Sequence, residues 1–258
     1  MCLLIMLAQT HPRFPLVVGA NRDEFLERPA VPMTVLRETD PRVLGGRDEL
    51  AGGTWLAVNE AGVVAALTNR PTPGGKDPTK RSRGDLPVAL ASHHSASAAV
   101  EALIATHRPA DYNAAWLLVG DREAAFAVDM SGGDAAVVQP LPPGVHILEN
   151  RPYGSASPKT RHVRELVGNA DALPEGQLVQ RLQVVLGDHD VPSGAAAVDE
   201  VGIEAPPEVK AACVHTEKYG TRWSGVITVP TAVDDAPTLR YADGPPCRAR
   251  YQDARSLW

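Results

Sequence analysis

The chain opens with Met1-Cys2-Leu3-Leu4-Ile5-Met6-Leu7-Ala8, an apolar run behind a small second residue. Methionine aminopeptidase removes Met1 when the next residue is small, so we expect Cys2 to begin the mature chain. Cys2 would then carry a thiol, with an ordinary pKa of about 8.5, and a free α-amine, with a pKa of about 8. The thiolate can attack a carbonyl carbon while the amine takes up and returns the proton. The alternative is that Cys2 is a small apolar residue at the start of a strand.

Composition limits the class of protein. The 258 residues are 44% hydrophobic and carry a net charge of −6, which is ordinary for a globular protein and argues against bulk nucleic-acid binding. Cys2, Cys213 and Cys247 are too few and too scattered for a disulfide framework or a zinc cluster, so no metal site and no cofactor are predicted. The apolar run Leu3–Ala8 is too short for a secretory core or a membrane span. We therefore expect a cytoplasmic protein with a small-molecule partner, and the sequence indicates no oligomeric state.

Apolar runs and turn residues predict one domain over residues 1–258, with a weakly patterned segment from about residue 230. Helices are predicted over Leu86–His107 in two pieces, over Pro158–Val167 behind an N-cap at Ser157, and over Glu175–Leu186. Residues 188–211 are predicted to form a loop. Strands are predicted over Cys2–Ala8, Leu16–Ala20, Trp55–Asn59, Val63–Asn69, Ala114–Gly120, Ala124–Asp129, Ala135–Gln139, Val145–Leu148, Ala212–His215, Trp223–Val229 and Thr238–Tyr241. This order predicts an α+β fold, a four-layer αββα sandwich with a helix pair on each outer face of two stacked sheets.

Polar residues stand where several of these strands end. The tetrad Asn21-Arg22-Asp23-Glu24 follows the second strand, and a hairpin would bring it near Cys2. Asp23 could hold the α-amine and Arg22 could lower the thiol pKa, whereas the alternative is a polar turn. Asn69-Arg70, Asn150-Arg151 and Thr221-Arg222 adjoin other strands, although Asn and Arg commonly end strands without any function.

Histidines and a basic loop offer other chemistry. His93 and His94 are adjacent in a predicted helix, so they would point to different faces and chelate poorly. Cys213 and His215 alternate on a predicted strand and could together contact a ligand, although a half-buried structural role is favoured. The loop with Lys76, Lys80, Arg81 and Arg83 is either solvated or attracts an anionic substrate.

Several long motifs in order resemble the NRDE family, also called the Transport and Golgi organisation 2 family. They are Met1-Cys2, Asn21-Arg22-Asp23-Glu24, Gly45-Gly46-Arg47-Asp48, Ala51-Gly52-Gly53-Thr54-Trp55-Leu56, Ala66-Leu67-Thr68-Asn69-Arg70, Ser82-Arg83-Gly84, Asp111-Tyr112-Asn113, Leu118-Val119-Gly120-Asp121 and Tyr219-Gly220-Thr221-Arg222. The residues after Val229 match least clearly. The family is similar to N-terminal-nucleophile hydrolases of the penicillin V acylase and bile salt hydrolase group, which implies an αββα fold.

The resemblance also implies roles for single residues. Cys2 matches the nucleophile, Asp23 the aspartate that contacts it, and Asn69 the position whose backbone lines the oxyanion hole. Asn150 matches the asparagine donor and Arg222 a late site arginine, while Asn21, Arg22, Glu24 and Arg70 are expected to contact substrate. The acylase group has an arginine three residues before its aspartate, where this chain has Ala20. Arg22 is expected to point away from Asp23, so acylase-like specificity is not carried over.

Three functions remain open at this point. The first is an amidohydrolase that cleaves a linear, non-peptide C–N bond, with Cys2 as nucleophile and with Asn150 and the Asn69 N–H as oxyanion donors. The second is a protein that binds haem or another hydrophobic anion on the same fold without hydrolysis. Family members are associated with haem mobilisation and Golgi organisation, and the basic loop could close over such a ligand. The third is an inactive relative with a structural role.

Overall fold

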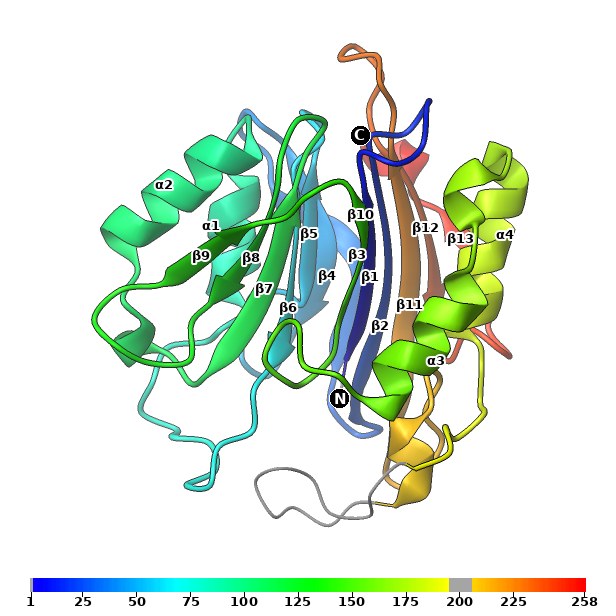
Figure 1. Ribbon diagram of the computed structural model, residues 1–258. Coiled ribbons are helices and arrows are strands. Elements are labelled where there is room, and N and C mark those ends of the chain that lie inside the picture. The colour runs from blue at the N-terminus through cyan, green and yellow to red at the C-terminus, as the bar shows by residue number, and fades with distance from the viewer. Residues whose placement is uncertain (1, 195–205) are drawn as a thin grey trace.

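The computed structural model describes residues 2–194 and 206–258, and within them two β-sheets lie face to face (Figure 1). The first sheet has the order β10 (Gly144–Leu148), β1 (Leu3–Ala8), β2 (Leu16–Phe25), β11 (Tyr219–Val229), β12 (Thr238–Asp243) and β13 (Gln252–Asp253). The second has the order β3 (Ala30–Arg37), β4 (Val43–Asp48), β5 (Leu56–Asn59), β6 (Val64–Asn69), β7 (Ala115–Gly120), β8 (Ala125–Asp129) and β9 (Val137–Pro140). Neighbouring strands pair in antiparallel fashion in both sheets.

A helix pair covers the outer face of each sheet (Figure 1). The helices α1 (Asp85–Ala91) and α2 (Ala96–Thr106) cover the second sheet, and α3 (Pro158–Val167) and α4 (Glu175–Leu186) cover the first. Short 3-10 helices lie at Pro109–Asp111, Ala170–Ala172, Pro207–Lys210 and Arg255–Leu257. The predicted α+β four-layer αββα sandwich is confirmed. No helix within the described ranges has both the length and the hydropathy needed to cross a lipid bilayer.

The opening strand shows why this sequence builds two layers of core. Successive side chains of a strand point to opposite faces. Leu4 and Met6 lie in the core between the sheets, whereas Leu3 and Ile5 lie in the core under α3 and α4. All six residues of β1 are buried, because one face meets the second sheet and the other meets the helices. A continuous apolar run is therefore required here rather than an alternating one.

Helix α3 starts as its sequence predicts. The Ser157 hydroxyl accepts a hydrogen bond from the Thr160 N–H at 3.0 Å, and the Thr160 hydroxyl accepts one from the Ser157 N–H at 3.2 Å. Pro158 takes the first helical position, where a missing N–H costs nothing. This cap places Lys159 in the first turn, next to the end of β2.

The structure departs from the predicted elements in four places. Strand β2 continues to Phe25, so the tetrad 21–24 lies inside the strand rather than in a turn after it. Strands β3 and β4 were not predicted, because β3 is half-buried along most of its length and contains a proline. No strand forms at Ala212–His215, which joins its neighbours through a single bridge between His215 and Gly220. Of the predicted loop 188–211, residues 195–205 lie outside the described ranges, and Pro207–Lys210 forms a 3-10 helix.

Candidate active site

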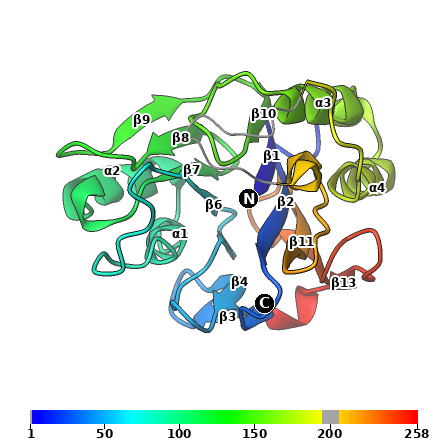
Figure 2. The ribbon, with the colours of Figure 1, turned by 90° about the horizontal axis from the view of Figure 1, so that it is seen from below.

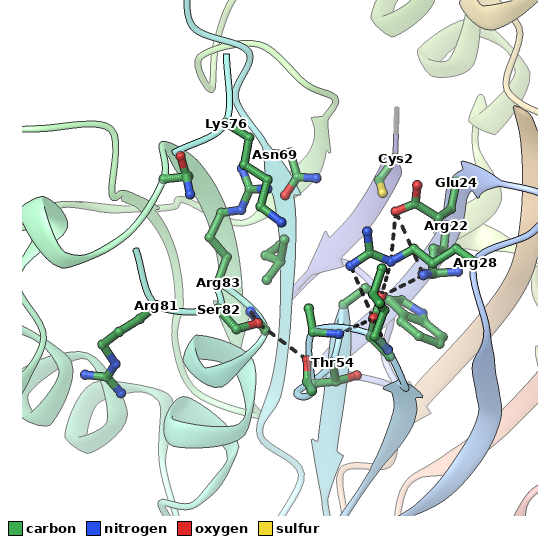
Figure 3. A pocket seen from close by; sticks show the side chains of 18 of the residues that line it. Cys2, Arg22, Glu24, Arg28, Thr54, Asn69, Lys76, Arg81, Ser82 and Arg83 are labelled. Carbon is green, nitrogen blue, oxygen red and sulfur yellow. Dashed lines mark hydrogen bonds and ion pairs between the residues drawn. The ribbon is translucent and has the colours of Figure 1, made fainter. Parts of the chain in front are cut away.

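Cys2 directly precedes β1 and lies between the two sheets. Seen from below, the N-terminus lies beside β1 and β2 of the first sheet, on the side that faces β6 of the second sheet (Figure 2). The Cys2 side chain follows the parity of Leu4 and Met6 and thus faces the space between the layers. It lines a cleft of about 470 Å³ at this end of the sandwich (Figure 3).

Asn150 connects Cys2 to the second sheet. The Cys2 main-chain nitrogen donates to Asn150 Oδ1 at 2.6 Å, and Asn150 Nδ2 donates to the carbonyl oxygen of Asn69. The neighbouring Thr68 hydroxyl donates to the Glu149 carbonyl at 3.0 Å. The residues that follow β10 are therefore fixed to the end of β6, with the nitrogen of Cys2 held at the junction.

The backbone of β6 leaves a donor directed at this cleft. The Leu67 N–H donates to the Trp55 carbonyl, and the Arg70 N–H donates to the Ala114 carbonyl, both at 3.0 Å. Alternate N–H groups of a strand point to the same side, so the Asn69 N–H points to the same side as that of Leu67. Pairing between β5 and β6 ends at Leu56, so the Asn69 N–H faces the space beyond the end of β5.

Asp23 lies on the other side of Cys2. Its main-chain N–H favours the ionised form of the Cys2 thiol and so opposes the rise in the thiol pKa, and its Oδ1 accepts a hydrogen bond from the Thr221 hydroxyl at 2.6 Å. Burial raises the pKa of the Asp23 carboxyl, and the nearby Lys159 ammonium opposes that rise. Lys159 is itself buried, and its Nζ makes no hydrogen bond within the described chain.

The thiol of Cys2 is held in its neutral form. Burial is the largest influence on the Cys2 thiol, and it raises the thiol pKa. The Asp23 carboxylate raises this pKa further, whereas the Asp23 N–H and the Arg22 guanidinium favour the thiolate. The sulfur therefore needs a base at the moment of attack.

Arg22 and Asp23 point to opposite faces of β2, as strand parity requires. The Arg22 guanidinium lies over the ring of Trp55, 4.5 Å from its centroid, and contacts Asp48 Oδ2 at 2.9 Å. Trp55 packs edge to face against Trp223, with ring centroids 5.7 Å apart. The Arg22 guanidinium thus packs on the ring of Trp55, which is in turn supported by Trp223 of the first sheet.

A cluster of charges around Asp48 forms one wall of the cleft. Arg28 Nε donates to Asp48 Oδ2 at 2.7 Å, and Glu24 lies within 3.6 Å of Arg28 and 3.9 Å of Arg22. Burial disfavours the ionised form of Asp48, but hydrogen bonds from Arg28 and from the Ala51 N–H outweigh it and lower the Asp48 pKa. This wall is therefore ionised and internally paired at neutral pH.

The opposite wall carries an excess of positive charge. The basic residues that line the cleft are Arg22, Arg28, Lys76, Lys80, Arg81 and Arg83, and the acidic ones are Asp23, Glu24 and Asp48. Arg83 donates to the Ala114 carbonyl at 3.2 Å rather than to a carboxylate. Burial lowers the Arg83 pKa, and an ionised Cys2 sulfur in the same cleft would raise it. The cleft is basic although the whole chain carries a charge of −6.

The model of the family described as Transport and Golgi organisation 2 matches residues 1–234 of the chain. The chain belongs to this family. A homologue from Mus musculus is 28% identical over 247 residues, covering 89% of this chain and 88% of the mouse protein. A homologue from Homo sapiens is 28% identical over 251 residues, with the same shares of both chains covered.

Solved structures share the fold of this Transport and Golgi organisation 2 family member. A conjugated bile acid hydrolase from Clostridium perfringens superposes with a TM-score of 0.51 at 14% identity, covering 99% of this chain and 93% of that one. A Caenorhabditis elegans orthologue of N-acylethanolamine-hydrolyzing acid amidase gives a TM-score of 0.54 at 13% identity, covering 92% and 98%. The chain thus has the fold of the N-terminal-nucleophile hydrolases.

Several residues predicted for the site of this family member come together in the structure. Those that line the cleft are Cys2, Arg22, Asp23, Glu24 and Asn69, and Asn150 contacts two of them. Ala20 stands where the acylase group has arginine, but Arg22 emerges from the same face of β2, two residues nearer to Cys2. A guanidinium therefore reaches the thiol from a different position.

Three other predicted residues lie outside the lining of the cleft. Asn21 faces α4, where its Nδ2 donates to the Leu186 and Ala212 carbonyls at 2.8 and 2.9 Å. Arg70 approaches Asp129 at 4.0 Å on the surface of the second sheet. Arg222 is the extra residue of a bulge between Thr221 and Trp223, and it donates to main-chain carbonyls of Phe25, Leu26 and Arg28. It holds the turn that carries Arg28.

Sequence reasoning missed Arg28, Lys159 and the hydroxyl of Thr221. Arg28 follows the named tetrad in a turn and has no pattern of its own. Lys159 sits in a helix cap that reads as purely structural, and only its burial reveals a role. Thr221 lies within the motif Tyr219-Gly220-Thr221-Arg222, and its position opposite Asp23 on the neighbouring strand is the signal that could reveal its role.

Proposed function

We propose that this chain is an N-terminal-nucleophile amidohydrolase that cleaves a linear, non-peptide C–N bond in a small anionic substrate. The observation that carries the proposal is the placement of Cys2, whose nitrogen lies 2.6 Å from Asn150 Oδ1 while its sulfur faces the basic cleft. Removal of Met1 would turn that nitrogen into a free amine beside the thiol. Both fold relatives named above are hydrolases by name, which supports the same class of reaction here.

The geometry supports acylation of Cys2. The α-amine takes the thiol proton while the sulfur attacks the substrate carbonyl carbon, and the carbonyl π electrons move to oxygen. Asn150 Nδ2 has two N–H groups, one of which donates to Asn69, so the second is available to the oxyanion. The Asn69 N–H supplies the other donor.

Collapse of this tetrahedral intermediate completes the reaction. The C–N bond breaks, the departing nitrogen takes the proton back from the α-ammonium, and a thioester remains on Cys2. Water then attacks the thioester with the amine as base, releases the carboxylic acid and restores the thiol. In its ionised form, Asp23 stabilises the α-ammonium that forms in each step.

The charge of the cleft indicates the class of substrate. Arg22 and Arg28 are paired with Asp48, but Arg83 is half-buried in the lining of the cleft and makes its hydrogen bond to a carbonyl oxygen. A partly desolvated guanidinium of this kind is well suited to bind a carboxylate or phosphate. We infer that the substrate carries such a group beside the scissile amide, as N-acyl amino acids do.

The test is a panel of N-acyl amino acids and neutral N-acyl amides, assayed with wild type and Cys2→Ala. We expect turnover of acidic members by wild type and none by Cys2→Ala, which retains the fold. Intact mass must show that Met1 is absent from both proteins. Equal turnover by Cys2→Ala, or retention of Met1 in an active preparation, contradicts the proposal.

A second arm isolates the oxyanion donor. Asn150→Asp keeps the oxygen that meets Cys2 but replaces the donating amide nitrogen, so kcat should fall by roughly 100-fold to 1000-fold. Asn169→Asp makes the same change at an exposed position and should leave kcat unchanged. Similar rates for both variants would remove Asn150 from the mechanism.

The basic cleft equally favours a second candidate, binding of haem or another hydrophobic anion without hydrolysis. Cys213 and His215, which the sequence linked to this function, are not among the described residues that line the cleft. Haem binding would give a Soret shift that Cys2→Ser leaves unchanged and that Arg83→Gln weakens. A Soret shift without turnover of any amide favours this candidate over the hydrolase.

A further inference from the structure

Four potential metal ligands meet outside the cleft. His189 follows α4, Cys213 and His215 precede β11, and Cys247 follows β12. One ligand atom from each lies within 4.8 Å of the others. None of the four is among the described residues that line the cleft, so the proposed hydrolysis does not account for the cluster.

Three distances within the cluster, among Cys213, His215 and Cys247, match the edges of a tetrahedron around one metal ion. The two sulfur atoms, of Cys213 and Cys247, are 3.9 Å apart, and His215 Nε2 lies 3.6 Å from the first and 3.3 Å from the second. Tetrahedral zinc with Zn–S bonds of about 2.3 Å and Zn–N bonds of about 2.05 Å separates two sulfurs by about 3.8 Å and sulfur from nitrogen by about 3.6 Å. The side chains therefore already stand near the positions that such an ion requires.

Surrounding contacts orient the ligands. Nδ1 of His189 lies 3.3 Å from the Cys213 carbonyl oxygen, and a proton donated there leaves the lone pair of Nε2 for a metal ion. The two imidazole rings have centroids 4.8 Å apart. The Cys213 N–H donates to the Asp188 carbonyl at 2.8 Å, which fixes the two ligand-bearing segments to each other. Hydrogen bonds from a ligand imidazole to a backbone carbonyl are typical of metal sites.

We propose that His189, Cys213, His215 and Cys247 bind one Zn²⁺ ion in a structural site. Two thiolates and two imidazoles form a donor set that zinc prefers, and four protein ligands leave no position for water or substrate. Binding releases the two thiol protons to solvent and changes no oxidation state. Scattered cysteines had argued against a metal site, but folding brings residues 213 and 247 together.

A disulfide between Cys213 and Cys247 is the competing use of these sulfurs. A disulfide needs an S–S distance of about 2.05 Å. It does not explain why the imidazoles of His189 and His215 lie next to the two sulfurs. Nε2 of His215 lies close to both sulfurs, as it must if all three atoms bind the same metal ion. A disulfide does not require a nearby imidazole. The donor set therefore favours zinc.

The site also holds a segment that supports Asp23. The Val214 N–H, between two of the ligands, donates to the Thr221 hydroxyl oxygen at 2.9 Å, and the same hydroxyl donates to Asp23 Oδ1 at 2.6 Å. Zinc would hold residues 213–215 in place and so would hold the Thr221 hydroxyl, which donates to Asp23. This coupling rests on the proposed hydrolase function, whereas zinc binding does not.

The experiment measures metal content and ligand type in the whole reduced chain. We expect one zinc per chain by elemental analysis, and replacement with Co²⁺ should give intense visible d–d bands and a thiolate-to-cobalt charge-transfer band. Cys247→Ser and His189→Gln alter exposed residues and should each weaken zinc affinity by about 100-fold or more, because even outer-shell changes cost 10–100-fold. Cys2→Ser and His94→Gln are the matched controls and should bind the metal as wild type does.

Each opposite result overturns the proposal. A reduced wild-type chain that takes up neither Zn²⁺ nor Co²⁺, or a cobalt spectrum without thiolate bands, excludes the site. Isolation of the chain with a Cys213–Cys247 disulfide assigns the sulfurs to that bond instead. If chelation abolishes amide turnover and reconstitution restores the cobalt spectrum, the coupling of the metal site to Asp23 is confirmed. If a zinc-free chain keeps its full turnover, the coupling is excluded but the zinc site is not.

Discussion

At Cys2, the surroundings oppose the charge that the reaction needs. Burial raises the pKa of the thiol, and burial also raises the pKa of Asp23 beside it. Cations offset part of this penalty for Asp23, and the largest side-chain contribution comes from Lys159. The ammonium of Lys159 is buried without a hydrogen bond in the described chain, which is costly unless the charge itself is useful.

Lys159→Met tests this role. The substitution removes the cation that favours ionised Asp23, so the pKa of Asp23 should rise further above its ordinary value. Asp23 would then lose its charge at a higher pH on acidification. The acid limb of the profile of kcat/KM against pH should therefore move to higher pH.

Lys218→Met is the matched control, because Lys218 is exposed and is not among the described residues that line the cleft. Its pH profile should coincide with that of wild type. Thermal unfolding of both variants checks that the fold is kept. An acid limb of Lys159→Met that stays in place, or moves to lower pH, contradicts the assigned role.

Among the elements, β4 and the segment before β5 shape the floor of the cleft. Gly46 lies so close to Trp55 that an added Cβ would stand 2.0 Å from the indole ring. This close approach lets the ring lie beneath the Arg22 guanidinium. The glycine pair of the Gly45-Gly46-Arg47-Asp48 motif thus serves packing at the site.

Gly46→Ala should displace the Trp55 ring and, with it, Arg22. We expect a loss of about 1–3 kcal/mol in the free energy of unfolding from overpacking, together with a lower kcat/KM. Gly176→Ala is the control, since a Cβ there meets open space in α4 and should be neutral or slightly stabilising. Denaturant unfolding and kinetics measure both, and an unchanged Gly46→Ala protein would contradict the close packing.

The predictability of each element follows from its burial. Helix α3 has a capping box at its start, and both α3 and α4 have an apolar stripe and end at a glycine, so their predicted bounds, Pro158–Val167 and Glu175–Leu186, equal those observed. Strand β3 alternates weakly, because most of its residues are half-buried at the edge of a sheet. Segment 212–215 has the apolar composition of a strand, but the Cys213 N–H bonds to the Asp188 carbonyl and the Val214 N–H to the side-chain hydroxyl of Thr221, instead of to main-chain carbonyls of a neighbouring strand.

The site was predictable where strand parity and the family motifs sufficed. Cys2 and Asn69 follow from their places at strand ends, whereas Asp23 lies inside β2 and follows from the family motif. Arg28 and Lys159 could not be found in this way, because their roles depend on a turn and on a helix that approach from elsewhere in the chain. The meeting of Cys213 and Cys247 likewise depends on tertiary structure alone.

For the whole molecule, the contrast between a basic cleft and an acidic chain has a kinetic consequence. Field lines concentrate in a cleft of one sign, which draws in ligands of the opposite sign. Salt weakens this attraction, because the Debye length falls from about 10 Å at 0.1 M to about 3 Å at 1 M.

For an anionic amide, kcat/KM should therefore decrease steadily between about 0.1 M and about 1 M salt. A neutral amide of the same acyl chain is the control and should show a nearly flat dependence. Steady-state kinetics over this range checks both. A flat response for the anionic substrate would show that the cationic residues of the cleft do not attract it.

The contact between the Cys2 nitrogen and Asn150, enclosed by the two sheets, has a practical consequence for handling the protein. Any leader left in front of Cys2, an affinity tag included, converts the amine into a peptide N–H and leaves the thiol without its base. Such a preparation would fold and would still present the basic cleft, yet it would report on ligand affinity alone. Purification handles belong at the other end of the polypeptide, after Trp258, which lies beside β12 and away from the cleft.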